Sequence, residues 1–140
     1  MNRKANKKDL NEVIQLIKDS FGYAWKKTHR KFDEKYFRKN ILNGINNDIC
    51  TVEIDKGKII AFAWASKQKD FFGNPCGEIK LIVIDRDYQN QGIGSRLLKH
   101  SEEKLGTKDL RLDCLCINPA SKLYKRKGYK EFIISFRKYI

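Results

Sequence analysis

The stretch from residue 78 to 98 constrains the fold more than any other part of the chain. Residues 78–84 are short and rich in β-branched side chains, which predicts a largely buried strand. The apolar residues Ile93, Leu97 and Leu98 then recur at helical spacing, which predicts the first turns of an amphipathic helix. A strand that passes through a short turn into a helix therefore stands at the centre of the domain.

The turn between this strand and this helix carries two glycines, Gly92 and Gly94. A helix N-terminus exposes backbone N–H groups and a partial positive charge, and glycine lets an anion approach the backbone without meeting a Cβ atom. The turn therefore predicts an anion site suited to phosphate. It is not a dinucleotide fingerprint, because Leu97 stands where the third glycine belongs. It is not a P-loop either, because Ser95 follows Gly94 where lysine would be required.

The rest of the chain divides into further periodic segments. Helical spacing predicts helices over residues 9–22 and 32–45, the first with Asp9 as N-cap and Glu12 completing a capping box. A short helix should begin at Asn118-Pro119 and stop at Gly128. The predicted strands are residues 3–5, 49–54, 59–66, 78–84, 110–117 and 129–139, with residues 67–76 as a loop. No repeat or linker interrupts this order, so we expect a single domain over residues 1–140.

Composition limits the class of protein. The net charge of +13 suits a polyanionic partner, but it is spread along the whole chain, which favours a solvated basic surface. The sequence has no apolar run of membrane-spanning length and no apolar segment typical of a secretory signal. We therefore expect a cytoplasmic protein with reduced thiols at its four cysteines. Its two histidines, His29 and His100, form no ligand pair, so we expect no metal.

Two short motifs resemble those of the GNAT superfamily of acyl-CoA-dependent N-acyltransferases. Gln89, Gly92 and Gly94 fill the superfamily's pyrophosphate loop, Gln/Arg-x-x-Gly-x-Gly/Ala. The segment Asn118-x-Ala120-x-x-Leu123-Tyr124-x-x-x-Gly128-Tyr129 resembles its second cofactor segment, Asn-x-x-Ala-x-x-Leu-Tyr-x-x-x-Gly-Phe. The element order also matches over nearly the whole chain. Arg86 departs from the pattern, because many members have proline there.

The resemblance implies a mixed α/β (α+β) fold, with a mostly antiparallel central sheet flanked by about four helices. It also implies acetyl-CoA as co-substrate, held by backbone groups of the strand, the loop and the second segment. The residues so assigned are Ile82, Ile84, Gln89, Gln91, Gly92, Gly94, Ser95 and Asn118. Lys122, Lys125 and Arg126 would lie near the adenosine end, where they either pair with the 3′-phosphate or form a solvated helix face.

Transfer of an acyl group to an amine needs a base, because a primary amine has a solution pKa of about 10 and arrives protonated. By resemblance Glu78 is the leading base, although a solvated carboxylate at a strand end would look the same. Asp113 is a lesser candidate. Tyr124 is the candidate acid that protonates the leaving thiolate, against the alternative of a core aromatic.

The resemblance thus implies an N-acetyltransferase that acts by direct attack in a ternary complex on an amine, borne by a small molecule or a protein. Two rivals are a basic RNA- or ribosome-associated protein on this fold and an acyl carrier through Cys114. A membrane partner is not expected, and a monomer and a homodimer both stay open. Five exposed-looking aromatic residues either stack on the acceptor, pack in a dimer or fill the core, and the sequence does not choose between these: Tyr23, Trp25, His29, Phe71 and Phe72.

Overall fold

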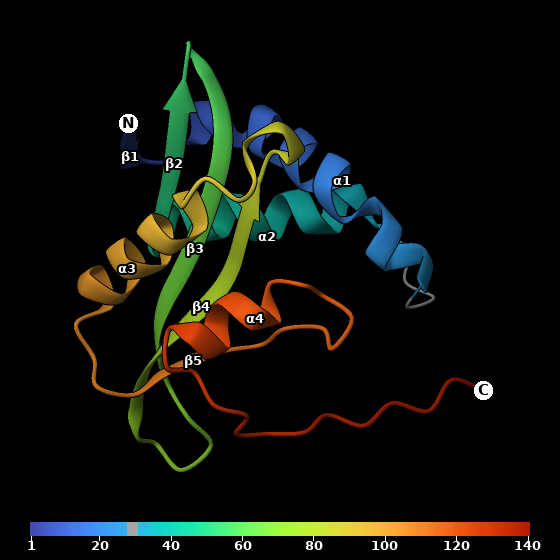
Figure 1. Ribbon diagram of the computed structural model, residues 1–140, viewed down its shortest axis with the longest axis vertical. Helices are drawn as coiled ribbons and strands as arrows, with labels where there is room; N and C mark the ends of the chain where they lie inside the picture. The colour runs from blue at the N-terminus through green and yellow to red at the C-terminus, as the bar shows by residue number, and fades with distance from the viewer. Residues whose placement is uncertain (28–30) are drawn as a thin grey trace.

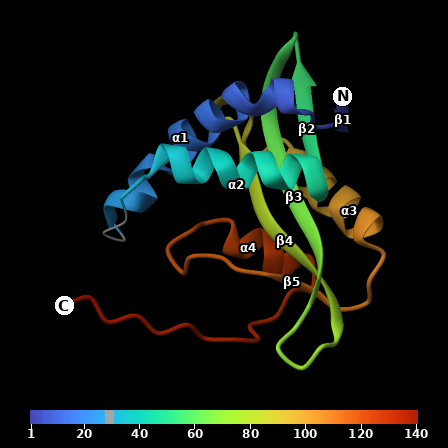
Figure 2. The same cartoon turned by 180° about the vertical axis from the view of Figure 1, so that it is seen from behind.

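The computed structural model describes residues 1–27 and 31–140 and has one sheet with helices on both faces (Figures 1 and 2). The five strands lie in the order β1-β2-β3-β4-β5. They are β1 (Asn2–Lys4), β2 (Ile49–Asp55), β3 (Lys58–Lys69), β4 (Pro75–Ile84) and β5 (Leu110–Leu112). Neighbouring strands are antiparallel except for β4 and β5, which run parallel. The predicted mixed, mostly antiparallel sheet is confirmed.

Among the described residues, four α-helices flank the sheet: α1 (Leu10–Lys27), α2 (Glu34–Asn47), α3 (Ile93–Leu105) and α4 (Ser121–Arg126). Helices α1 and α2 bury Val13, Ile17 and Ile41 against one face of β2–β4. Helix α3 buries Leu97 and Leu98 against the opposite face. Within the described ranges no helix is long and apolar enough to cross a membrane.

The start of α1 differs from the prediction. Asn6, not Asp9, is the N-cap, and it begins a 3-10 turn (η1, Lys7–Asp9) that leads into α1. Asp9 is the third residue of that capping box: its carboxylate accepts the N–H of Asn6 at 2.8 Å and pairs with Arg3 at 2.8 Å. Glu12 instead accepts the N–H of Ile59 on β3 at 3.2 Å, which ties the helix to the sheet.

The β3–β4 hairpin is longer than predicted, because a tight turn stabilised by the Asp70 side chain stands where a longer loop was expected. Its Oδ1 atom accepts the N–H groups of Phe72 and Asn74, both at 2.9 Å, while Gly73 takes a left-handed φ of 83°. Both strands therefore continue to the rim, and only residues 70–74 connect them.

Strand β4 also contains a bulge that periodicity alone does not reveal. Trp64 lies opposite Leu81, but the next residue, Ala65, lies opposite Ile79, so Lys80 is an extra residue in β4. A bulge of this kind switches which face of the sheet the later side chains meet. Leu81 accordingly packs with α1 and α2, whereas Ile79 packs with α3.

The C-terminal part departs most from the prediction. Strand β5 forms only over Leu110–Leu112, not over residues 110–117, and the strand predicted at 129–139 is absent. Residues 130–140, the C-terminal segment, are extended and exposed throughout, including Phe132 and Phe136. Alternating apolar residues form a strand only beside a pairing partner, and this segment has no register with any strand of the sheet.

Candidate active site

The parallel strands β4 and β5 separate part-way along their length. Their register ends at Ile79 opposite Leu112, while β4 continues to Ile84. The N–H of Asp85 donates to Ile60 of β3 at 2.8 Å. Because alternate residues of a strand direct their peptide groups to opposite sides, those of Ile84 and Ile82 face the opening, away from β3. The structure thus leaves a strand edge beside this opening.

A turn over residues 85–92 leads from the end of β4 to the N-terminus of α3, where Gly94 packs against Ile84 (Figure 1). Gly92 is its N-cap in a left-handed conformation, with φ 81°, and no side chain caps the helix. The first helical hydrogen bond runs from the N–H of Arg96 to the Gly92 carbonyl at 3.1 Å. The N–H groups of Ile93, Gly94 and Ser95 therefore precede the helical ladder and are oriented to bind an anion.

The two glycines of this loop have different surroundings. A Cβ atom at Gly92 would meet nothing within 4 Å, so the space above it is open. A Cβ atom at Gly94 would lie 3.1 Å from Ile84 Cδ1 and 3.4 Å from Leu123 Cδ2. Gly92 is thus the position of close approach for a ligand, whereas Gly94 allows α3 to pack tightly against β4 and α4.

The glutamines of the loop contribute through their side chains in a way that the motif did not predict. Gln89 Nε2 donates to the Ile84 carbonyl at 3.1 Å, and Gln91 Nε2 donates to the Asp87 carbonyl at 3.4 Å. Ser20 of α1 reaches the same Ile84 carbonyl at 3.5 Å. Gln89 therefore fixes the loop to the end of β4, which holds the α3 N-terminus beside the opening.

Glu78 lies on the face of the sheet covered by α1 and α2. It stands opposite Ser66, two residues beyond Trp64, whose ring packs in the α1–α2 cluster. Its side chain is half-buried and has neither a hydrogen bond nor an ion pair among the described residues. The carboxylate is therefore available to accept a proton from a group that enters from the α1–α2 face.

Tyr124 lies on the other face. Its ring packs against the cluster that contains Ile79 and Leu98, and it meets the Tyr129 ring edge-on at 6.2 Å. Burial, with a smaller contribution from the Cys114 thiol, raises the pKa of Tyr124 to about 12. Its hydroxyl has no hydrogen-bond partner among the described residues. Tyr124 is thus a neutral donor that is ready for an acceptor.

The rest of the second segment is held less firmly. Asn118 Oδ1 accepts the N–H of Ala120 at 2.9 Å, so it forms a turn before α4, and Ala120 is the N-cap in its place. Lys122 and Arg126 are exposed, and Lys125 pairs with Glu131 at 3.2 Å on the surface.

The two lesser candidates lie between β5 and α4. Asp113 is exposed, and Cys114 is half-buried with its pKa raised by desolvation. A raised pKa keeps the Cys114 thiol protonated and weakly nucleophilic, which argues against an acyl carrier at this position.

Of the five aromatic residues that could contact an acceptor, the structure describes the side chains of two. Phe71 and Phe72 are exposed at the tip of the β3–β4 hairpin. His29 lies outside the described residues, and so do the side chains of Tyr23 and Trp25.

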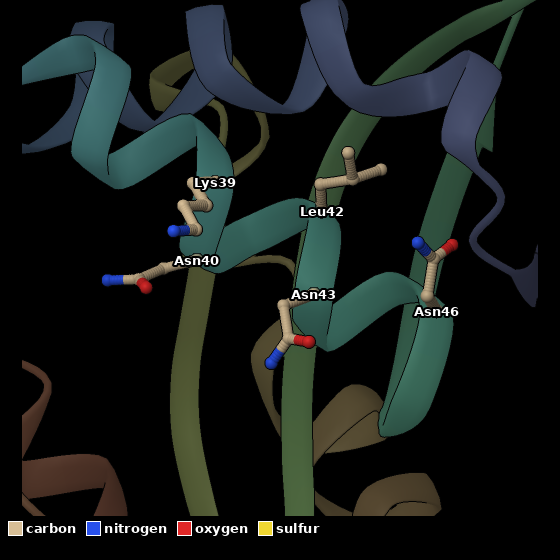
Figure 3. A pocket seen from close by; sticks show the side chains of 5 residues that line it. All are labelled: Lys39, Asn40, Leu42, Asn43 and Asn46. Atoms are coloured by element: carbon tan, nitrogen blue, oxygen red, sulfur yellow. The ribbon is translucent and has the colours of Figure 1, made fainter.

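A hollow of about 360 Å³ lies along α2, on the far side of the sheet from α3 (Figure 3). Its lining comes from one helix only: Lys39, Asn40, Leu42, Asn43 and Asn46. The side chains in Figure 3 point outward from the ribbon and enclose no reacting group. We therefore place the candidate site at the opening between β4 and β5 and not in this hollow.

The residues at the opening fit an acyl-CoA. Uncapped N–H groups and the open space at Gly92 suit a pyrophosphate. Arg86 and Lys122 are exposed cations, whereas Arg96 pairs with Glu53 of β2 at 2.8 Å. The Ile84 carbonyl is already bonded to Gln89, so the peptide groups of Ile82 and the N–H of Ile84 are the ones that suit an extended amide-bearing arm, which would bind as an added strand does. In the described part of the chain no group of three His, Cys, Asp or Glu residues could hold a metal ion.

Comparison with known proteins agrees with this geometry. The profile of the acetyltransferase (GNAT) family matches residues 10–129. An S-(2-succino)cysteine N-acetyltransferase from Bacillus subtilis is 31% identical over 100 residues, which cover 64% of this chain and 59% of that enzyme.

Solved structures share the fold over the whole chain. A Bacillus halodurans protein has a TM-score of 0.87 at 15% identity, with 100% of this chain and 99% of that one covered. The aminoglycoside N-acetyltransferase AAC(6′)-Iy, solved in complex with CoA, has a TM-score of 0.71 at 19% identity, with 100% of both chains covered. The chain belongs to the GNAT family of acetyltransferases.

Proposed function

We propose that the protein transfers an acetyl group from acetyl-CoA to an amine by direct attack in a ternary complex. The observation that carries this proposal is the opening between β4 and β5, which places a free strand edge next to the uncapped N-terminus of α3. One part suits an extended amide chain and the other suits a pyrophosphate, in the order in which these groups occur in CoA.

The two candidate catalytic side chains lie on opposite faces of the sheet at the same level of β4. Acetyl-CoA, when bound, supplies a thioester that is already activated for attack. Glu78 accepts the amine proton from the α1–α2 face, either directly or through water, and so generates the nucleophile. Tyr124 donates a hydrogen bond from the α3–α4 face toward the charge that develops on sulfur. This division lets donor and acceptor approach the opening from different sides.

For the acceptor we propose the amino group of a small anionic amino acid, such as an S-substituted cysteine that bears carboxylates. The Bacillus subtilis relative carries such an acceptor in its name, and the aligned region spans 59% of its length. The net charge of +13 favours an anionic acceptor over the polycationic aminoglycosides and polyamines. An RNA-binding role would draw on the same positive charge, but it gives no function to the opening.

Initial rates of thiol release test the proposal. With acetyl-CoA as donor, turnover should be more efficient for S-(2-succino)cysteine than for an aminoglycoside or spermidine. When both substrate concentrations are varied, the double-reciprocal plots should give intersecting lines, as expected for a ternary complex. Glu78→Gln should lose turnover, whereas Glu103→Gln, the same change at an exposed site on α3, should not. Parallel lines would indicate an acyl-enzyme instead. An absence of CoA binding, together with strongly salt-dependent RNA binding, would refute the enzyme and support the RNA-binding alternative.

A further inference from the structure

The C-terminal segment, residues 130–140, combines a strand-forming sequence with exposure to solvent. Phe132 is 76% exposed, Ile134 72% and Phe136 92%, although these residues alternate as one apolar face of a strand would. Large apolar side chains gathered in this way on a surface mark an interaction site more often than they are left in water. The structure shows the segment as an extended trace beyond α4 (Figure 1).

We infer that this segment forms an antiparallel two-stranded pair with the same segment of a second copy, centred on Ile134, and so makes the protein a homodimer. In this register Phe132 lies opposite Phe136 of the partner subunit, twice over, on a single apolar face. Aromatic pairs directly across two strands are among the stabilising pairs of antiparallel sheets. A two-fold axis makes every such contact occur twice.

Charge on the second face selects the same register. With Ile134 on the axis, Glu131 lies opposite Arg137 of the partner subunit, and the reciprocal pair forms on the other side. A shift by two residues in either direction loses both charge pairs. Within one chain Glu131 contacts Lys125 at 3.2 Å and Arg137 lies over the Tyr139 ring at 5.3 Å. The one unfavourable pair, Lys130 with Lys138 of the partner subunit, lies on the phenylalanine face, at its two ends, where long side chains separate readily.

A second exposed apolar element lies beside the segment. Arg111 of β5 pairs with Asp70 at 3.0 Å and lies 5.2 Å from the Phe132 ring, so it connects the hairpin tip to the start of the segment. That tip presents Phe71 and Phe72, which are 95% and 83% exposed. Four phenylalanines at about 150–250 Å² each offer about 600–1000 Å² per copy. A stable interface needs about 800 Å² per partner.

Sedimentation velocity with charge-reversal variants tests this pairing. The wild-type protein should be a dimer. Glu131→Arg should weaken dimerisation about ten- to thirtyfold, because both cross-strand pairs become repulsive. The double variant Glu131→Arg with Arg137→Glu should restore the dimer. Glu103→Arg on α3 and Lys125→Ala should leave it unchanged, which separates the intermolecular pair from the surface pair within one chain. A monomeric wild-type protein, or a failure of the double variant to recover, would overturn the proposal.

Disulfide trapping tests the register itself, in a Cys116→Ser background that removes the exposed native thiol. Ile134→Cys should crosslink two copies efficiently, because residues opposite each other lie about 4.5–5.5 Å apart between Cα atoms, within disulfide reach. Phe136→Cys should not, because its symmetry mate lies four residues along the strand, about 13 Å away. Equal crosslinking at both positions, or none at Ile134→Cys, would refute the predicted pairing.

Discussion

The two sides of the candidate cofactor site are held with very different firmness. On the α3 side the loop rests on a packed helix: Ile93, Leu97 and Leu98 are at most 5% exposed, and Gln89 anchors the loop to β4. On the α4 side, between residues 106 and 140, no residue is buried. The phosphate-binding half is thus part of the core, whereas the half that carries Tyr124 rests against it.

This difference indicates how the site should respond to a ligand. Segments with few buried apolar contacts open at low free-energy cost, and a ligand that binds only the closed form stabilises it. We expect CoA to find its pyrophosphate site already formed and to order α4 when the rest of the molecule binds. Three features link α4 to the core: the contact of Leu123 with Gly94, the Tyr124 ring, and the 2.8 Å hydrogen bond from Tyr129 to Glu102.

The largest effect that distinguishes the two sides should come from paired leucine truncations. Leu97→Ala removes a side chain with 0% exposure and should lower the free energy of unfolding by about 2–5 kcal/mol. Leu123→Ala on α4 removes a half-buried side chain and should cost about 1–2 kcal/mol. Urea denaturation followed by circular dichroism measures both. Equal losses would show that α4 belongs to the same cooperative core as α3.

The same difference explains what the sequence could predict. The strand, glycine turn and helix at residues 78–98 were predictable, because their apolar periodicity reflects burial in the core. Segments with weaker burial were predicted worst: residues 113–117 and 129–139 have strand-like composition but lack a neighbouring strand in the structure. Strand formation depends on a pairing partner, which composition does not specify.

Some details of the site could not be predicted from the sequence, for a different reason. The bulge at Lys80 decides that Glu78 faces α1 and α2, yet no residue type marks a bulge of this kind. The motif identified Gly92 and Gly94 as a pair, and only packing distances separate the open position from the close-packed one. Asp9 and Asn6 are both residue types that favour the N-cap position, and the backbone geometry selects Asn6.

The second largest effect should come from Glu78, the candidate base on strand β4. Glu78→Gln keeps the shape of the side chain but removes its ability to accept a proton. Turnover at neutral pH should fall about a hundredfold, with CoA affinity nearly unchanged. The loss should shrink as pH rises, because more of the amine is then unprotonated. Rates measured from pH 6 to 10 check this. A wild-type rate at pH 7 would transfer the role to Asp113 or to water.

Tyr124 tests the loosely held side. Tyr124→Phe should slow turnover about ten- to a hundredfold, because one hydrogen-bond donor to the developing thiolate is lost while the ring remains. Turnover of thioesters with better leaving groups should fall less.

The pKa of about 12 at Tyr124 also predicts how stability depends on pH. A raised pKa contributes stability that is fully present below the unfolded value of about 10, and this contribution is lost as pH rises through about 12. The variant should therefore resist alkaline unfolding better than the wild type.

The smallest effect should come from a pair of glycines with similar backbones, Gly92 and Gly106. Both take left-handed conformations, with φ 81° and 62°, so alanine at either position costs about 1–2 kcal/mol of strain. Neither Cβ atom would clash, because Gly92 has nothing within 4 Å and Gly106 has only the Glu103 carbonyl at 4.0 Å.

Only Gly92 lies at the predicted pyrophosphate site, so the pair separates ligand contact from strain. Gly92→Ala should weaken CoA binding about tenfold in calorimetric titration, because its methyl group occupies the space that the anion needs. Gly106→Ala should lose the same stability and keep the affinity. If both variants bind CoA equally, strain alone accounts for the change, and the phosphates do not approach the α3 N-terminus at this residue.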